Sequence, residues 1–220
     1  MLRRCCVIRG IMVSCRLIMC EMDVVETIRC IKADLRSAMN GATVEYMRRN
    51  GLEYKLNFGV ELPRIKEIAG NYPKNHMLAQ ALWKENAREC KIMASMLQPV
   101  EQFCSELADV WMESMPNEEI AQHTVQQLFC RLSYASEKAF EWIASEREMA
   151  QVCGFMLLGR LFLNEKSLNE RSENEFLDQA LAAVSGEGSV RRAAVRALQS
   201  YMSLSADAEK RVEALLVNKK

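Results

Sequence analysis

Apolar residues recur with the period of an α-helix from Asp23 to the end of the chain, and no stretch alternates convincingly with the period of a strand. Short segments rich in Gly, Pro, Asn or Ser interrupt this pattern, so the chain divides into a series of short helices. The predicted helices cover 23–39, 43–49, 63–72, 78–84, 86–97, 99–115, 117–132, 136–144, the apolar run around 153–159, 173–184, 190–202 and 206–217.

The helices follow one another through short turns, which favours an all-α architecture. The chain has 220 residues, half of them hydrophobic, so it can bury a sizeable core in one domain. We expect an α-α superhelix, or solenoid, in which each helix pair buries one face on the next pair and curvature leaves one concave surface. Sequence identity between the pairs is poor, so an irregular helical bundle is the structural alternative.

The segment 59–96 contains the most specific motif of the chain. Pro63 stands in the first turn of a predicted helix, where its missing N–H costs little. A Leu-Trp dipeptide, followed at a set distance by Arg-Glu, is hard to obtain from helix composition alone. The motif consists of Gly59, Val60, Leu62, Pro63, Leu82, Trp83, Arg88, Glu89 and Ala94.

This segment resembles the DNA alkylation repair family, the AlkD-like alkylpurine DNA glycosylases built from HEAT-like repeats. An unrelated helical protein with an accidental Leu-Trp is the alternative. The resemblance implies a HEAT-like solenoid that binds duplex DNA. In that family an Asp four residues after a Trp supplies the catalytic carboxylate, and an Arg following a Trp-x-x-Ser segment on a later helix assists at the backbone. The carboxylate stabilises the oxocarbenium ion that develops at the sugar.

The chain contains the family's Trp-x-x-Ser segment but not these catalytic residues. Trp142 and Ser145 match the Trp-x-x-Ser segment, whereas Gln151 and Val152 stand where the Arg is expected. The best register places Gln122 and Gln126 at the Trp and Asp positions, within about one helical turn. A Gln forms hydrogen bonds but does not neutralise a cationic transition state.

We therefore predict a shared scaffold without the family's usual glycosylase residues. The scaffold residues are Trp83, Arg88, Glu89, Trp142 and Ser145. The remaining catalytic candidates are Gln122, Gln126 and Glu119.

Charge is distributed unevenly along the chain. Residues 1–100 contain 16 Lys and Arg against 10 Asp and Glu, residues 101–150 contain 3 against 10, and residues 151–220 contain 10 against 9. Affinity for duplex DNA comes largely from Lys and Arg that replace phosphate counterions, so the acidic centre favours a second hypothesis, a non-enzymatic HEAT-like scaffold that binds a protein or peptide. Two basic groups are candidates for nucleic-acid binding: Arg48, Arg49 and Lys55, and Arg191, Arg192 and Arg196.

Cysteine and histidine usage predicts a cytoplasmic protein without a metal. Nine cysteines, an odd number, include no Cys-x-x-Cys pair, and only His76 and His123 could add imidazole ligands. We read the cysteines as reduced, small apolar residues. No glycine-rich phosphate loop occurs, so no cofactor is expected.

Residues 1–22 differ from the rest of the chain. Arg3 and Arg4 precede a short apolar run that Arg9 and Arg16 interrupt, so this segment is too short and too charged to cross a bilayer. We expect either sequence upstream of a true start at Met22 or a poorly ordered extension, with an export signal as the third alternative. Residues 23–220 then form a single HEAT-like repeat domain, predicted to be a monomer.

Overall fold

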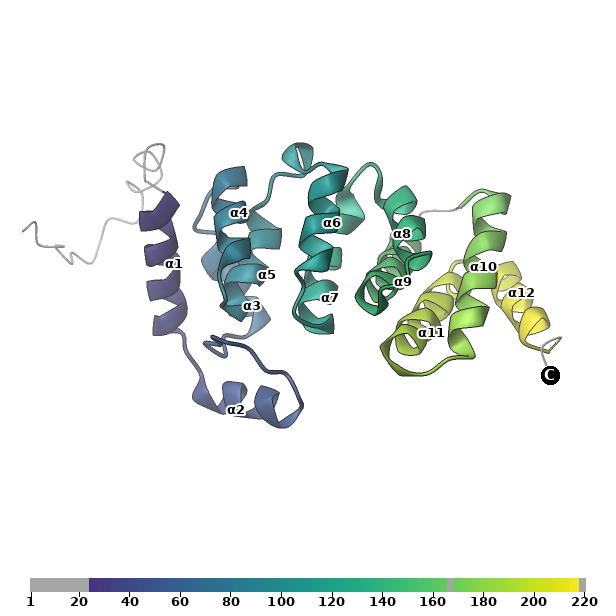
Figure 1. The fold of residues 1–220 in the computed structure, drawn as a ribbon, viewed down its shortest axis with the longest axis horizontal. Coiled ribbons are helices and arrows are strands. Elements are labelled where there is room, and N and C mark those ends of the chain that lie inside the picture. The colour runs from purple at the N-terminus through teal and green to yellow at the C-terminus, as the bar shows by residue number, and fades with distance from the viewer. Residues whose placement is uncertain (1–23, 166–167, 218–220) are drawn as a thin grey trace, which may run out of the picture.

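A computed structural model describes residues 24–165 and 168–217 and shows twelve α-helices with two short 3₁₀ turns in these segments (Figure 1). An isolated bridge between Leu56 and Ala87 is the β-type pairing seen in the described part of the chain. The predictions for residues 1–22 lie outside the described residues. The helices are α1 Val24–Ser37, α2 Gly41–Arg49, α3 Leu62–Ala69, α4 His76–Lys84, α5 Arg88–Leu97, α6 Ser105–Glu113, α7 Glu118–Gln127, α8 Ala135–Ile143, α9 Glu148–Leu163, α10 Glu170–Val184, α11 Gly188–Met202 and α12 Ala206–Val217.

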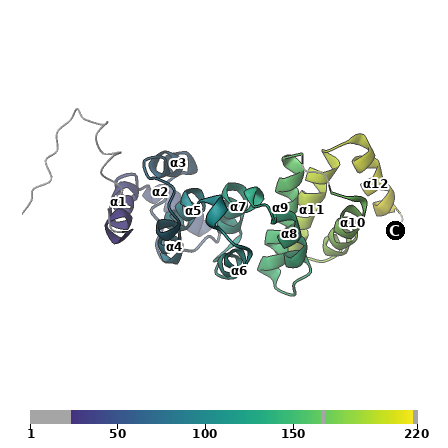
Figure 2. The same ribbon diagram turned by 90° about the horizontal axis from the view of Figure 1, so that it is seen from above.

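The helices from α3 to α11 form two rows along the molecule, as the view from above shows (Figure 2). In the odd-numbered row, α3, α5, α7, α9 and α11 each pack on the next. The even-numbered row contains α4, α6, α8 and α10, and α4, α8 and α10 each pair with the odd-numbered helix that follows. The predicted all-α architecture of stacked helix pairs is confirmed.

Helix α9 is enclosed by neighbouring helices, as its apolar sequence predicts. It packs on α7, α8 and α11, and ten of its 16 residues are buried. Gly154 allows α8 to approach closely, because a Cβ at this position would lie 2.7 Å from the Ala139 carbonyl oxygen and 2.7 Å from Ile143 Cγ1. None of the described helices is both long enough and apolar enough to cross a membrane.

Aromatic side chains connect successive helix pairs through the core. Trp83 of α4 stacks on Trp111 of α6 with 4.1 Å between ring centroids and 3° between planes. Phe103 then meets both Trp111 and Phe129, and Phe129 contacts Trp142 of α8. The tryptophans of the sequence motifs therefore belong to one continuous core, where such ring pairs contribute about 1 kcal/mol each beyond their buried area.

The predicted helix over 99–115 is divided in two. Val100–Gln102 forms a 3₁₀ turn, and α6 begins only at Ser105 because Phe103 and Cys104 adopt extended conformations. The Tyr134 hydroxyl donates a 2.6 Å hydrogen bond to the Phe103 carbonyl, which holds this break in place. A long-range contact of this kind overrides local periodicity.

Two helices begin at other residues than the predicted ranges 43–49 and 86–97. Asn40 caps α2 through hydrogen bonds from the Ala42 and Thr43 amides, so this helix begins at Gly41 and Thr43 lies inside it. Helix α5 begins after Ala87, and its first residues show no side-chain cap. Glu89, in the first turn of α5, accepts hydrogen bonds from the Phe58 and Val60 amides.

Candidate nucleic-acid interface

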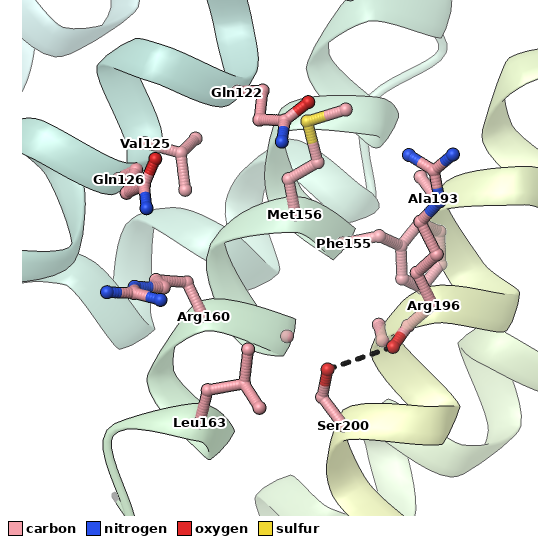
Figure 3. Close-up of a pocket in the computed structure, with 12 residues that line it drawn as sticks. Gln122, Val125, Gln126, Phe155, Met156, Arg160, Leu163, Ala193, Arg196 and Ser200 are labelled. Carbon is pink, nitrogen blue, oxygen red and sulfur yellow. Dashed lines mark hydrogen bonds between the residues drawn. The ribbon is translucent and has the colours of Figure 1, made fainter. Parts of the chain in front are cut away.

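A pocket of about 210 Å³ opens between α7, α9 and α11 of the odd-numbered row (Figure 3). Its polar side chains are those of Gln122 and Gln126 from α7, Arg160 from α9, and Arg196 and Ser200 from α11. Apolar side chains make up the rest of the wall, including Leu163, which is 57% exposed. No Asp or Glu lines this pocket.

The two glutamines lie four residues apart, so helical geometry brings both to the same face of α7. Gln122 is exposed and Gln126 half-buried, with buried Val125 beside them in the wall. Neither side-chain amide has a hydrogen-bond partner among the described residues, so both are available to a ligand. The structure thus brings together two of the three catalytic candidates.

Arg160 is a pocket residue that sequence reasoning missed. It lies on the side of the pocket nearest Gln126 (Figure 3), and its buried Nε has no hydrogen-bond partner in the part of the chain that the structure describes. It also forms no ion pair there. The signal in the sequence was a single basic residue within the apolar run 152–163.

Arginines of α11 continue the basic surface beyond the pocket. Arg196 projects from the side opposite Arg160 (Figure 3), and its side chain, like that of Arg191, has no ion-pair partner within 24–165 or 168–217. Arg192 differs because its Nη2 lies 2.7 Å from Glu118 Oε1 of α7. Two of the three predicted arginines of this group are therefore unpaired.

The other predicted basic group lies away from the pocket. Arg48 and Arg49 are exposed at the end of α2 and both pair with Glu45, at 2.7 and 3.1 Å. Lys55 is exposed in the connector after α2. Because i,i+3 and i,i+4 pairs on a surface are weak, these arginines can exchange Glu45 for another anion at little cost.

Glu119, the third catalytic candidate, lies outside the pocket and is held by its neighbours. Arg88 Nη2 lies 2.6 Å from Glu119 Oε1, and Tyr54 donates a hydrogen bond to the same carboxylate. Burial opposes ionisation of Glu119, but interactions with His123, Arg88 and Tyr54 outweigh it and lower the pKa to about 2. The carboxylate therefore stays ionised and does not act as a proton donor near neutral pH.

The scaffold residues also lie outside the pocket, and all of them except half-buried Ser145 are buried. Trp83 Nε1 donates to Ser114 Oγ, and Trp142 Nε1 donates to Asp109 Oδ1 at 2.7 Å. The Ser145 carbonyl accepts a 2.8 Å hydrogen bond from Gln151, the residue that replaces the expected Arg. The contact of Gln151 fixes the turn between α8 and α9, whereas the two tryptophan contacts connect α4 and α8 to α6 and its C-cap residue. In the described part of the chain, no group of three or more His, Cys, Asp or Glu side chains is placed to hold a metal ion.

A family model described as DNA alkylation repair enzyme matches residues 31–161, more than half of the chain. The chain belongs to this family. No curated protein matches it in sequence. A solved structure described as "a new family of proteins related to the HEAT-like repeat DNA glycosylases with affinity for branched DNA structures" is similar in fold, with a TM-score of 0.76 and 17% identity over 87% of this chain and 80% of that chain. The predicted family and the HEAT-like fold are thus confirmed.

Proposed function

We propose that this protein is a member of the DNA alkylation repair family that binds DNA on the odd-numbered row without excising alkylated bases. The observation that supports this is the composition of the pocket. Two neutral glutamines and two arginines line it, and no carboxylate does. We propose further that the protein acts as a monomer in the cytoplasm and needs no cofactor.

The absence of a carboxylate from the pocket weighs against base excision. An alkylated purine is already cationic, and cleavage of its glycosidic bond develops positive charge at the sugar. A carboxylate stabilises that charge, whereas the guanidinium of Arg160 would oppose it. Glu119 does not replace the missing acid because its oxygens are bound by Arg88 and Tyr54.

The acidic centre of the sequence is less of an obstacle to DNA than the residue count implies. Five of its ten acidic residues lie on α6 and α8, which belong to the even-numbered row and do not line the pocket. Five of the ten are also ion-paired: Asp109 and Glu141 with Lys138, Glu113 with Arg147, Glu118 with Arg192, and Glu119 with Arg88.

A second candidate function is a scaffold that binds a basic protein or peptide. Exposed acids on the even-numbered row, such as Glu137, favour it. The two functions use different surfaces, so charge changes separate them. Loss of binding to a basic partner on changing α8 acids would support the scaffold, whereas loss of DNA binding on changing α11 arginines supports our proposal.

The test is binding of purified protein to labelled DNA across a salt series. Because the solved structure of similar fold is described by its affinity for branched DNA, four-way junctions are compared with duplexes of the same sequence. We expect binding at low salt that weakens steeply with added salt, and no release of 7-methylguanine or 3-methyladenine from alkylated DNA. Absence of binding at low salt would refute the DNA proposal, and base release would refute the non-excising part.

A further inference from the structure

We propose that the α7–α9–α11 pocket is an anion site, in which Arg160 and the two glutamines bind a phosphate of a nucleic-acid strand and exclude a cationic alkylated base. This inference rests on the proposed DNA binding and goes further, since it names the group that enters the pocket. It concerns a position on α9 that the family's sequence motifs do not include.

The first support is that hydrogen-bond donors in the pocket have no partner within the described part of the chain. Arg160 Nε is buried and has no hydrogen-bond partner among the described residues. A buried polar group without a partner costs about 1–3 kcal/mol, so a ligand that accepts from Nε regains this energy. Guanidinium groups present planar donor pairs that match phosphate oxygens. Gln126 lies on the same side of the pocket as Arg160 (Figure 3), and its amide adds a further donor.

The second support is the sign of the charge. The pocket has two arginines and no acidic side chain, so its formal charge is positive. A cationic purine would be repelled, whereas a phosphate would be attracted, and the low dielectric of a half-buried pocket strengthens both effects. Replacement of a carboxylate by glutamine at the position predicted for the family's Asp therefore does more than remove a catalyst. It reverses which ligand the pocket prefers.

The third support is the size and position of the pocket. At about 210 Å³ it is smaller than pockets that enclose drug-sized ligands, so it takes one group of a strand. Arg196 lines the α11 wall opposite Arg160 (Figure 3), and Arg191 lies beyond that wall on the same helix. This arrangement suits neighbouring phosphates of one strand, the pocket holding one and the α11 arginines another.

The test uses two variants of the full-length protein with matched controls. Arg160→Gln removes the charge, and Gln126→Glu supplies a carboxylate that pairs with Arg160 and blocks it. The controls are Arg171→Gln, at an exposed position of α10, and Gln127→Glu, one residue further along α7 and outside the pocket. We expect each pocket variant to lose about tenfold in DNA affinity at low salt. The slope of the logarithm of affinity against the logarithm of salt concentration should become less steep by about one, while the controls match wild type.

Duplexes with and without 7-methylguanine separate a phosphate from a base as the ligand. We expect equal affinity for both. A wild-type preference for the methylated duplex that Gln126→Glu strengthens would overturn the inference. Equal DNA affinity of Gln126→Glu and Gln127→Glu, with wild type still binding DNA, would overturn it while leaving the proposed function intact.

A titration with inorganic phosphate, followed by the ¹H–¹⁵N resonance of Arg160 Nε, separates the pocket from DNA binding as a whole. We expect a saturable shift at millimolar phosphate that Gln126→Glu abolishes, even if DNA binding itself should fail. No shift would refute the anion site. Saturation at micromolar phosphate, with DNA affinity unchanged in Gln126→Glu, would overturn the strand assignment in favour of a free phosphate ligand.

Discussion

The Arg88 guanidinium joins the first turn of α5 to the first turn of α7, with its Nη2 2.6 Å from Glu119 Oε1. Arg88 is 3% exposed and also donates to the Val60 carbonyl at 3.0 Å. The neighbouring Glu89 is fully buried and accepts from the Phe58 and Val60 amides. The Arg-Glu motif therefore attaches the connector after α2 to the odd-numbered row.

Glu119→Ala is expected to destabilise the protein. Removing Glu119 takes away the closer of the two carboxylates that compensate the buried Arg88 and leaves only Glu89 at 3.2 Å, so we expect the free energy of unfolding to fall by about 3 kcal/mol. Urea unfolding followed by circular dichroism measures this. Glu113→Ala, which breaks the exposed pair with Arg147, is the control and should cost about 1 kcal/mol or less. Equal effects of the two changes would contradict a structural role for Glu119.

Stability should also fall in acid through the same carboxylate. The Glu119 pKa is lowered from 4.5 to about 2 in the folded protein, so its contribution is complete above about pH 4.5 and is lost as the pH falls toward 2. Unfolding free energies of wild type and Glu119→Ala, measured from pH 7 to pH 2, isolate this effect by difference. The difference in unfolding free energy should shrink as the pH falls from about 4.5 toward 2. A difference that stays constant would show that the pKa of Glu119 is not lowered in the folded protein.

Gly154→Ala should weaken the contact between α8 and α9. The added methyl group would lie within 3 Å of the Ala139 carbonyl oxygen and of Ile143, so overpacking should cost about 1–3 kcal/mol. Gly41→Ala is the control because the methyl group added there would have open space around it, with no neighbouring atom within 4 Å, and it should keep or slightly raise stability. Thermal unfolding compares the two.

The helices could be predicted from the sequence because periodic apolar faces and Gly or Pro breaks are local signals. Helix 206–217 matches α12, and the helix predicted to begin at residue 117 does begin there, with Asn117 as the cap of α7. The break at Phe103 could not be predicted, since it depends on the Tyr134 hydroxyl 31 residues away. The partners of Glu89 could not be predicted for the same reason, because the Phe58 and Val60 amides belong to another segment.

The candidate site could be predicted only in part. The spacing of Gln122 and Gln126 placed both on one face, and the structure puts that face in the pocket. Arg160 was not identified because an arginine in an apolar helix gives no sign of which neighbour it meets. That depends on how α9 lies between α7 and α11, which is a matter of packing between helices.

Arg191→Gln combined with Arg196→Gln should reduce DNA binding. Each unpaired arginine that meets a phosphate releases about one counterion, so the salt slope of the logarithm of affinity should fall by about two. Fluorescence anisotropy across a series from about 50 mM to about 200 mM salt would measure this. The matched control, Arg36→Gln with Arg171→Gln, changes the same number of exposed arginines on α1 and α10. Equal slopes for both double variants would exclude α11 from the interface.

Thiol reactivity should follow burial. Burial raises the pKa of Cys90 and of Cys153 to about 12, so neither forms appreciable thiolate near neutral pH. Cys104 is exposed and should react with iodoacetamide in the native protein, with the sites identified by peptide mass spectrometry. Cys90 and Cys153 should react only after unfolding. Native labelling of Cys153 would show that α9 opens locally.

The enclosure of α9 also bears on how a ligand is recognised. Because α7, α8 and α11 surround this helix, its amide protons should exchange with solvent only when the whole domain unfolds. The backbone that positions Arg160 then has almost no freedom to adapt when DNA arrives. The pocket is therefore preformed, and it selects ligands by rejecting groups that do not match its shape and charge. Any conformational change on binding takes place in the nucleic acid.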